Sequence, residues 1–231
     1  ANIPVVMVIG NHDNPLSFGK AHALDILHQF PTEGIHVIDT PCRFTLETKS
    51  GPIQIVGIPW PSRTTLSLKT EHISSHPDEI SQYISDTVAH IVQQQAEQLD
   101  PHLPSILTGH LTVSSGIFSG SEKQAIYGKD PVLLPSQLAI PPFDYVALGH
   151  LHRYQDLNPE GTPVVYSGSI ERIDFGERQE TKGYNLVTID EKQAQQTFKP
   201  VPQRQFIQID VSVTHGHNQT QEIINAIKEY D

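Results

Sequence analysis

The sequence predicts a mixed α/β (α+β) fold in which short strands alternate with a few helices. The prediction rests on short apolar runs rich in β-branched residues, on one long segment with helical periodicity, and on turn signals directly after the runs. With 231 residues and 37% hydrophobic content, the chain can bury a sizeable core. It fits one larger α/β domain, or one domain plus a fragment of another.

The first apolar run, Val5–Ile9, predicts a fully buried strand that ends in the polar turn Gly10-Asn11-His12-Asp13. A helix is expected over residues 20–30, stopping before Pro31. Shorter strands are expected next, at Ile35–Ile38, Arg43–Glu47 and Ile53–Ile58.

The segment Pro77–Leu99 has the clearest helical pattern, and its apolar positions fall at spacings of three, four and seven. Pro77 suits the first turn, and Ser75 or His76 is a candidate cap. The residues expected to form one buried stripe are Ile80, Tyr83, Ile84, Val88, Ile91, Val92 and Leu99.

Three further apolar runs each end in a polar signature: SILTGH in His110, FDYVALGHLH in His150 and His152, and PVVYSGSIER in 167–172. A buried strand followed by Gly-His places an imidazole at the edge of a sheet, with Gly permitting a sharp turn. We therefore expect Asn11-His12, His110 and His150–His152 to lie side by side. The second His-x-His, His215 and His217, falls in a polar loop and is not expected to be functional.

A domain boundary is predicted near residues 199–205, after strands Asn185–Ile189 and Thr197–Val201. Residues 1–200 would form the main domain, and 205–231 would begin a second one with an alternating strand over Phe206–Val213. The chain starts without Met and stops in a periodic segment, so both ends are expected to be truncated.

Composition narrows the class of protein. The net charge of −11 argues against a generally basic nucleic-acid surface, although bound cations or a partner subunit can neutralise phosphate instead. No apolar stretch approaches the roughly 18 residues of a membrane span and no signal peptide is recognisable, so a cytoplasmic protein is expected. Cys42 is the only cysteine, which excludes an intrachain disulfide.

Two common catalytic motifs are absent from the sequence. Neither the G-x-x-x-x-G-K-[ST] phosphate loop of nucleotide hydrolases nor the G-x-S-x-G nucleophile elbow of α/β-hydrolases occurs.

Asn and His side chains suit divalent metals such as Mn, Fe or Zn, and a site that mixes nitrogen with oxygen ligands favours Mn or Fe over a structural zinc. In a two-metal site the cations clamp a phosphate and generate hydroxide. A nearby His that is not a ligand can protonate the leaving group.

These motifs together resemble a known family. GNHD at Gly10–Asp13, GH at Gly109–His110 and GHLH at Gly149–His152 occur in the order of the third, fourth and fifth motifs of the calcineurin-like metallophosphoesterases. With GNHDNP, TGHLTVSSG, YVALGHLHRYQ and YSGSIERIDFGE, the chain more narrowly resembles the bacterial SbcD exonuclease subunits, over roughly residues 4–190.

The resemblance implies a β-sandwich flanked by helices and lacking its first strands, with 205–231 as the start of a small DNA-recognition cap domain. It implies that Asn11, His110 and His150 bind one metal, that His152 binds a second, and that His12 is the catalytic acid. It further implies two divalent metal ions, with Mn preferred over Mg, Fe or Zn. The implied activity is cleavage of DNA, as an exonuclease on double strands and an endonuclease on single strands or hairpins. The implied partners are DNA, an SbcC-type ATPase and a second copy in a homodimer. For Arg172, a place near the phosphate path and an ordinary surface ion pair both stay open.

The sequence also departs from the family. A D-x-H after the opening strand and a G-D-x-x-D after the next strand supply a bridging aspartate and further ligands in the family, and neither is present at such a position. We therefore expect this chain alone to be inactive, with an open sheet prone to association. Two alternatives remain: another calcineurin-like phosphoesterase, acting on cyclic nucleotides or phosphoproteins, and a non-enzymatic scaffold for an ATPase.

Overall fold

The computed structural model describes residues 3–13, 24–29, 34–63, 65–66, 76–120, 130–213, 216 and 218–230. Strands lie at the positions expected up to Pro200, and helices are few, which confirms the mixed α/β class. In chain order the elements are β1 (Val5–Val8), α1 (Asp25–Gln29), β2 (Ile35–Ile38), β3 (Cys42–Thr48), β4 (Gly51–Ile58), α2 (Pro77–Ala96), β5 (Ser105–His110), β6 (Thr112–Val113), β7 (Val132–Leu133), α4 (Pro135–Leu138), β8 (Tyr145–Gly149), β9 (Gln155–Asp156), β10 (Val164–Tyr166), η2 (Phe175–Glu177), β11 (Gly183–Asp190), β12 (Gln193–Pro200) and α5 (Gln219–Lys228).

A six-stranded mixed sheet in the order β3-β4-β5-β8-β10-β9 forms the centre of the molecule. Its four middle strands are parallel, whereas β3 and β9 pair antiparallel at the two edges. Because parallel strands run in one direction, the carboxyl ends of β4, β5, β8 and β10 meet at one edge of the sheet. The residues that follow these ends are therefore brought together.

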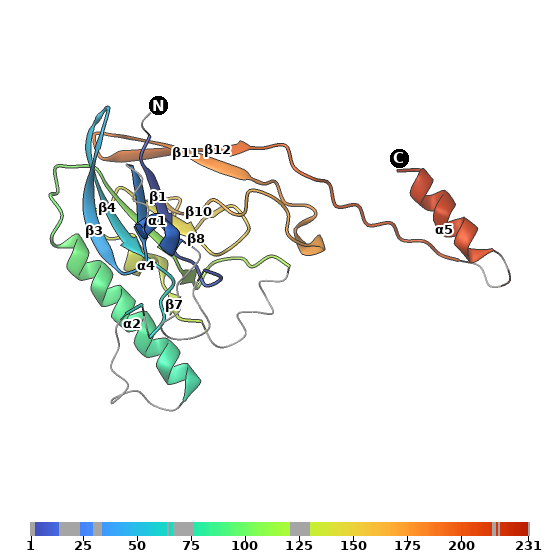
Figure 1. Cartoon of the computed structure of the whole chain (residues 1–231), viewed down its shortest axis with the longest axis horizontal. Helices are drawn as coiled ribbons and strands as arrows, with labels where there is room; N and C mark the ends of the chain where they lie inside the picture. The colour runs from blue at the N-terminus through green and yellow to red at the C-terminus, as the bar shows by residue number, and fades with distance from the viewer. Residues whose placement is uncertain are drawn as a thin grey trace.

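Helix α2 covers one face of this sheet, at the lower left of Figure 1. Val88 and Val92 are fully buried against Val56 and Leu107, so the predicted apolar stripe forms part of the core. Tyr83 is an exception, because its side chain is 49% exposed and the expectation of burial is wrong there. His76 occupies the N-cap position, but its side chain makes no capping hydrogen bond. Pro77 begins the helix as expected.

Strands β1 and β2 form a separate parallel pair that packs as a second layer against the central sheet. Ile38 of β2 lies directly over Gly57 of β4, where any side chain would collide with it. Strand β1 is not fully buried as predicted, since Val5 is 45% exposed. Among the residues that the structure describes, β1 pairs with β2 alone, so the other edge of β1 has no described neighbour.

The hairpin β11–β12 leads into an extended segment, 201–213, which carries α5 away from the body of the molecule (Figure 1). The strand predicted over Phe206–Val213 is wrong, because this segment has extended backbone without a pairing partner among the described residues. Alternation of side chains favours an extended chain, but a strand also needs a neighbour for its hydrogen bonds. The end of β12 coincides with the predicted boundary, and the cap domain stays a prediction.

Part of the expected helix 20–30, the candidate cap Ser75, and both His215 and His217 lie outside the described residues. In the part of the chain that is described, no helix is both long and apolar enough to cross a membrane.

Candidate metal centre

Asn11, His110 and His150 meet at the carboxyl edge of the parallel strands, as the sequence predicts. The register of β5 with β8 sets His110 opposite Gly149, so His150 is the next residue along the neighbouring strand. The His110 and His150 ring centroids are 5.1 Å apart, and His110 Nε2 lies 3.0 Å from Asn11 Oδ1. Two imidazoles and an amide thus come from three segments that are distant in sequence.

The glycines before these residues make room for His110. A Cβ at Gly10 would lie 2.8 Å from His110 Cε1, and one at Gly149 would lie 3.2 Å from its Nδ1. Neither glycine has a positive φ, although the chain does turn after Gly10, where Asp13 N donates to Gly10 O at 3.3 Å. Close approach to the imidazole is what requires a residue without a side chain at both positions.

His150 combines strained backbone with an unsatisfied nitrogen. Its φ of 104° lies in a region that costs a non-glycine residue about 1–3 kcal/mol. The side chain is 7% exposed, and its buried Nε2 has no hydrogen-bond partner among the described residues. Asp130 Oδ2 lies 3.5 Å away without hydrogen-bond geometry. A buried nitrogen that lacks a partner is costly unless something else, such as a cation, occupies its lone pair.

His110 is held neutral by its surroundings. Burial lowers its pKa from the ordinary 6.5 to about 3, and repulsion from His150, His12 and His152 acts in the same direction. A neutral imidazole is the form that ligates metals. The same effect shows that all four histidines share one electrostatic neighbourhood.

Trp60 is a member of the site that sequence reasoning missed. It follows β4, and its ring lies 4.9 Å from that of His150 and 5.9 Å from that of His110. Its backbone N–H donates to Ile9 O at 2.8 Å, which ties the end of β4 to the end of β1. The position after a buried parallel strand was the available signal, because it places Trp60 at the same edge as the histidines.

His12 lies in the turn directly after β1 and is exposed, which leaves its side chain able to face a substrate. Asp13 caps this turn, since its Oδ2 accepts a hydrogen bond from Gly10 N at 2.8 Å. The GNHD motif therefore presents Asn11 toward His110 while its last residue stabilises the loop.

His152 stands on the other side of the site and has a different environment. Its Nδ1 lies 2.8 Å from Oε1 of Glu177, a carboxylate with no exposure to solvent. Lys182, also buried, contacts both Glu177 and Glu180 at 2.8 Å. Sequence reasoning missed these three partners, because nothing in their spacing links them to His152.

Arg172 does not form, with any described residue, the surface ion pair that was one of its two expected settings, and its place near the phosphate path stays a prediction. Its guanidinium donates to three backbone carbonyls, those of Glu177, Glu180 and Arg204, at 3.2, 2.9 and 2.6 Å. Its donors therefore hold the loop 171–182 together and tie it to the backbone of Arg204.

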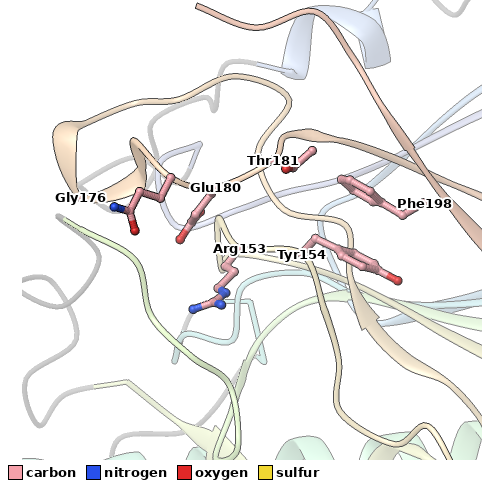
Figure 2. Close-up of a pocket in the computed structure, with 7 residues that line it drawn as sticks. Arg153, Tyr154, Gly176, Glu180, Thr181 and Phe198 are labelled. Carbon is pink, nitrogen blue, oxygen red and sulfur yellow. The ribbon is translucent and has the colours of Figure 1, made fainter. Parts of the chain in front are cut away.

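A pocket of about 520 Å³ opens beside this loop (Figure 2). Tyr154 and Phe198 stack within it at 4.2 Å between ring centroids, and Arg153 and Glu180 line the side nearest the loop. The pocket adjoins His152 through its chain neighbour Arg153.

The donor set fits part of a site for a borderline divalent cation. Asn11 Oδ1 and the imidazoles of His110 and His150 supply oxygen and nitrogen ligands, and the orphaned Nε2 of His150 is able to bind. Within the described residues, however, no three His, Cys, Asp or Glu side chains are grouped to hold a metal. Asp100-Pro101-His102 matches the letters of the D-x-H motif, but it lies in a turn after α2 and not after the opening strand. There Asp100 Oδ1 accepts a hydrogen bond from the backbone N–H of His102.

The resemblance to metallophosphoesterases implies a mixed α/β protein, and this chain has imidazole and amide groups at the carboxyl edge of its sheet. More narrowly, the chain resembles the SbcD component of SbcCD nucleases. It is 28% identical over 205 residues to the SbcD component of the SbcCD nuclease from Staphylococcus epidermidis, which confirms the resemblance drawn from the motifs. The match covers 86% of this chain and 50% of the relative, so the chain spans about half the length of that protein.

No protein-family model matches the chain. Among solved structures, it is similar to a provisionally assigned 5′-nucleotidase from Staphylococcus aureus in complex with alpha-ketoglutarate, with 12% identity and a TM-score of 0.42. That match covers 97% of this chain and 42% of the other, and at this TM-score it carries no argument.

Proposed function

We propose that this chain carries the core of the metal site of a nuclease subunit, which hydrolyses DNA phosphodiester bonds in an SbcCD-type complex for DNA repair, recombination and replication. The observation that carries the proposal is the convergence of Asn11, His110 and His150, with a buried nitrogen of His150 left without a hydrogen-bond partner among the described residues. The similarity to a staphylococcal SbcD protein supports DNA as the substrate and an SbcC-type ATPase as the partner.

In this proposal Asn11, His110 and His150 bind one divalent cation, and His152 binds a second. Manganese is preferred over magnesium, iron or zinc because the site mixes imidazole with amide oxygen. Bound cations would neutralise the phosphate and activate water for attack. His12, exposed beside the ligands, protonates the leaving oxygen as a general acid.

The D-x-H and G-D-x-x-D motifs that supply the bridging aspartate in the family are not present at the expected positions of this sequence. We therefore propose that residues outside this chain complete the site, and that the 231-residue chain alone does not cleave DNA. The segment after β12, with α5, begins the DNA-recognition part, and the whole subunit works as a homodimer. All of these statements concern a whole protein of which the chain spans a part.

The test is cleavage of a labelled duplex and a labelled hairpin by the whole gene product with Mn²⁺. We expect cleavage by the wild type and a loss of at least about 100-fold in His12→Ala, since general acid catalysis contributes on the order of 10²–10⁴-fold. His90→Ala is the matched control, because His90 lies on the exposed face of α2. It should cleave like the wild type.

Turnover of a small phosphodiester without cleavage of DNA would move the protein to another branch of the phosphoesterases. Retention of full cellular function by His12→Ala would favour the scaffold alternative. Robust cleavage by the 231-residue chain itself would refute the claim that its site is incomplete.

A further inference from the structure

Tyr166–Glu177, the motif YSGSIERIDFGE, has no assigned role in the proposed reaction, yet its last residue reaches the candidate ligand His152. Glu177 Oε1 lies 2.8 Å from His152 Nδ1, and the carboxylate is fully buried. The His152 side chain is 24% exposed, so part of the ring reaches solvent while Nδ1 contacts the buried carboxylate.

The contacts of Glu177 set the direction of this hydrogen bond. Glu177 Oε2 accepts from Ile173 N at 3.2 Å and pairs with Lys182 Nζ at 2.8 Å, so Oε1 is the oxygen that His152 Nδ1 contacts. A carboxylate paired with a lysine ammonium accepts hydrogen bonds, so His152 donates from Nδ1. In this tautomer Nε2 is the ring nitrogen that carries the lone pair.

Glu177 is itself fixed from several directions. Lys182 Nζ contacts Glu177 Oε2 at 2.8 Å and also donates to the backbone carbonyl of His152 at 2.8 Å. Arg172 and Lys182 therefore tie the loop, its carboxylate and the backbone of the histidine into one unit. A side chain locked in this way can set the direction of the ring it contacts.

The charged groups of the cluster are paired with one another. Lys182 Nζ contacts Glu177 Oε2 and Glu180 Oε2 at 2.8 Å each, and Ser119 Oγ donates to Glu180 Oε1 at 2.5 Å. The other oxygen of Glu177, Oε1, contacts His152 Nδ1. A hydrogen bond from the imidazole to a fixed carboxylate strengthens the ring as a ligand.

We propose that Glu177 is a positioning residue, which holds His152 in the Nδ1–H tautomer so that Nε2 faces the metal site. This inference rests on the proposed function for the ligand role of His152, but not for the tautomer. Glu177 acts through the ring and touches neither substrate nor cation.

The test reads the tautomer and the metal affinity separately. Imidazole ¹⁵N NMR of the metal-free whole gene product gives the tautomer, with His152→Gln used to assign the signal. Isothermal titration with Mn²⁺ gives the affinity. The variants are Glu177→Gln, Glu177→Asp, which keeps the charge at shorter reach, and Glu160→Gln, the same change at an exposed position.

We expect His152 to be in the Nδ1–H form in the wild type and in Glu160→Gln. Glu177→Gln should give a mixture of tautomers and weaken Mn²⁺ binding by about 10- to 100-fold, with partial rescue in Glu177→Asp. A wild-type signal from the Nε2–H form would overturn the proposal even if Glu177→Gln does not fold. Unchanged tautomer or unchanged affinity in a folded Glu177→Gln would also overturn it. Unchanged Mn²⁺ affinity in His152→Gln would instead refute the ligand assignment under the proposed function.

Discussion

The two sides of the candidate site keep imidazole nitrogens available by opposite means. His110 and His150 are buried beside Trp60, and desolvation keeps the proton off His110. His152 is partly exposed and is oriented by a buried carboxylate. The first arrangement depends on exclusion of water, whereas the second depends on charges that balance one another.

This difference decides which perturbation destabilises each side. A fall in pH destabilises the His110 side, because protonation of His110 would place a charge in a buried position beside other histidines. Removal of a charge acts on the His152 side, because each member of a buried ionic cluster depends on its partner.

The largest effect is expected from Lys182→Met. The change leaves the fully buried Glu177 without its cationic partner and should lower the free energy of unfolding by about 3–5 kcal/mol. Urea denaturation would measure it, with Lys199→Met on the exposed side of β12 as the control. Glu177→Gln combined with Lys182→Met should recover part of the loss. A loss below about 1 kcal/mol in Lys182→Met would show that the cluster is not a coupled unit.

A smaller effect is expected from pH on the metal-free protein. The folded-state pKa of His110 is about 3 and its unfolded value is 6.5, so the unfolded chain binds a proton first as pH falls. His110 therefore contributes fully to stability above pH 6.5, and this contribution falls with a slope of up to about 1.4 kcal/mol per pH unit. Urea unfolding between pH 6.5 and 5, where most carboxylates stay ionised, measures the slope. His110→Gln should flatten it and His90→Gln should not, and equal slopes in all three proteins would contradict the assigned pKa.

The strands and the three converging segments could be predicted from the sequence because local pattern sets them. His110 and His150 each follow an apolar run, and parallel neighbouring strands bring such ends to one edge of a sheet. Asn11 also follows an apolar run, but β1 pairs with β2 in a separate sheet, so its contact with His110 depends on how the two sheets pack. The second reason for Gly10 and Gly149 could not be predicted, since the space that they leave is filled by His110, which is distant from both in the sequence.

The remaining partners could not be predicted from one sequence, since their role depends on three-dimensional contacts. Glu177 and Lys182 look like surface charges in a polar loop, and only the fold shows that both are buried. Tyr83 has the correct helical spacing, yet it is 49% exposed while Ser85, two residues on, is buried. Phe206–Val213 alternates like a strand, yet no described strand lies beside it.

The smallest effect is expected from Ser169→Ala, which separates the strong contacts of Glu177 from a weak one. Ser169 Oγ lies 3.5 Å from Glu177 Oε2, at the limit of hydrogen bonding, whereas Lys182 Nζ lies 2.8 Å from the same oxygen. The backbone N–H of Ser169, which donates to His152 O at 3.0 Å, is retained in the variant. The free energy of unfolding should therefore fall by less than about 0.5 kcal/mol, as measured by urea denaturation beside the wild type. A loss above about 1 kcal/mol would mean that the hydroxyl shares in holding Glu177, and that the ionic side of the site depends on neutral donors as well as on Lys182.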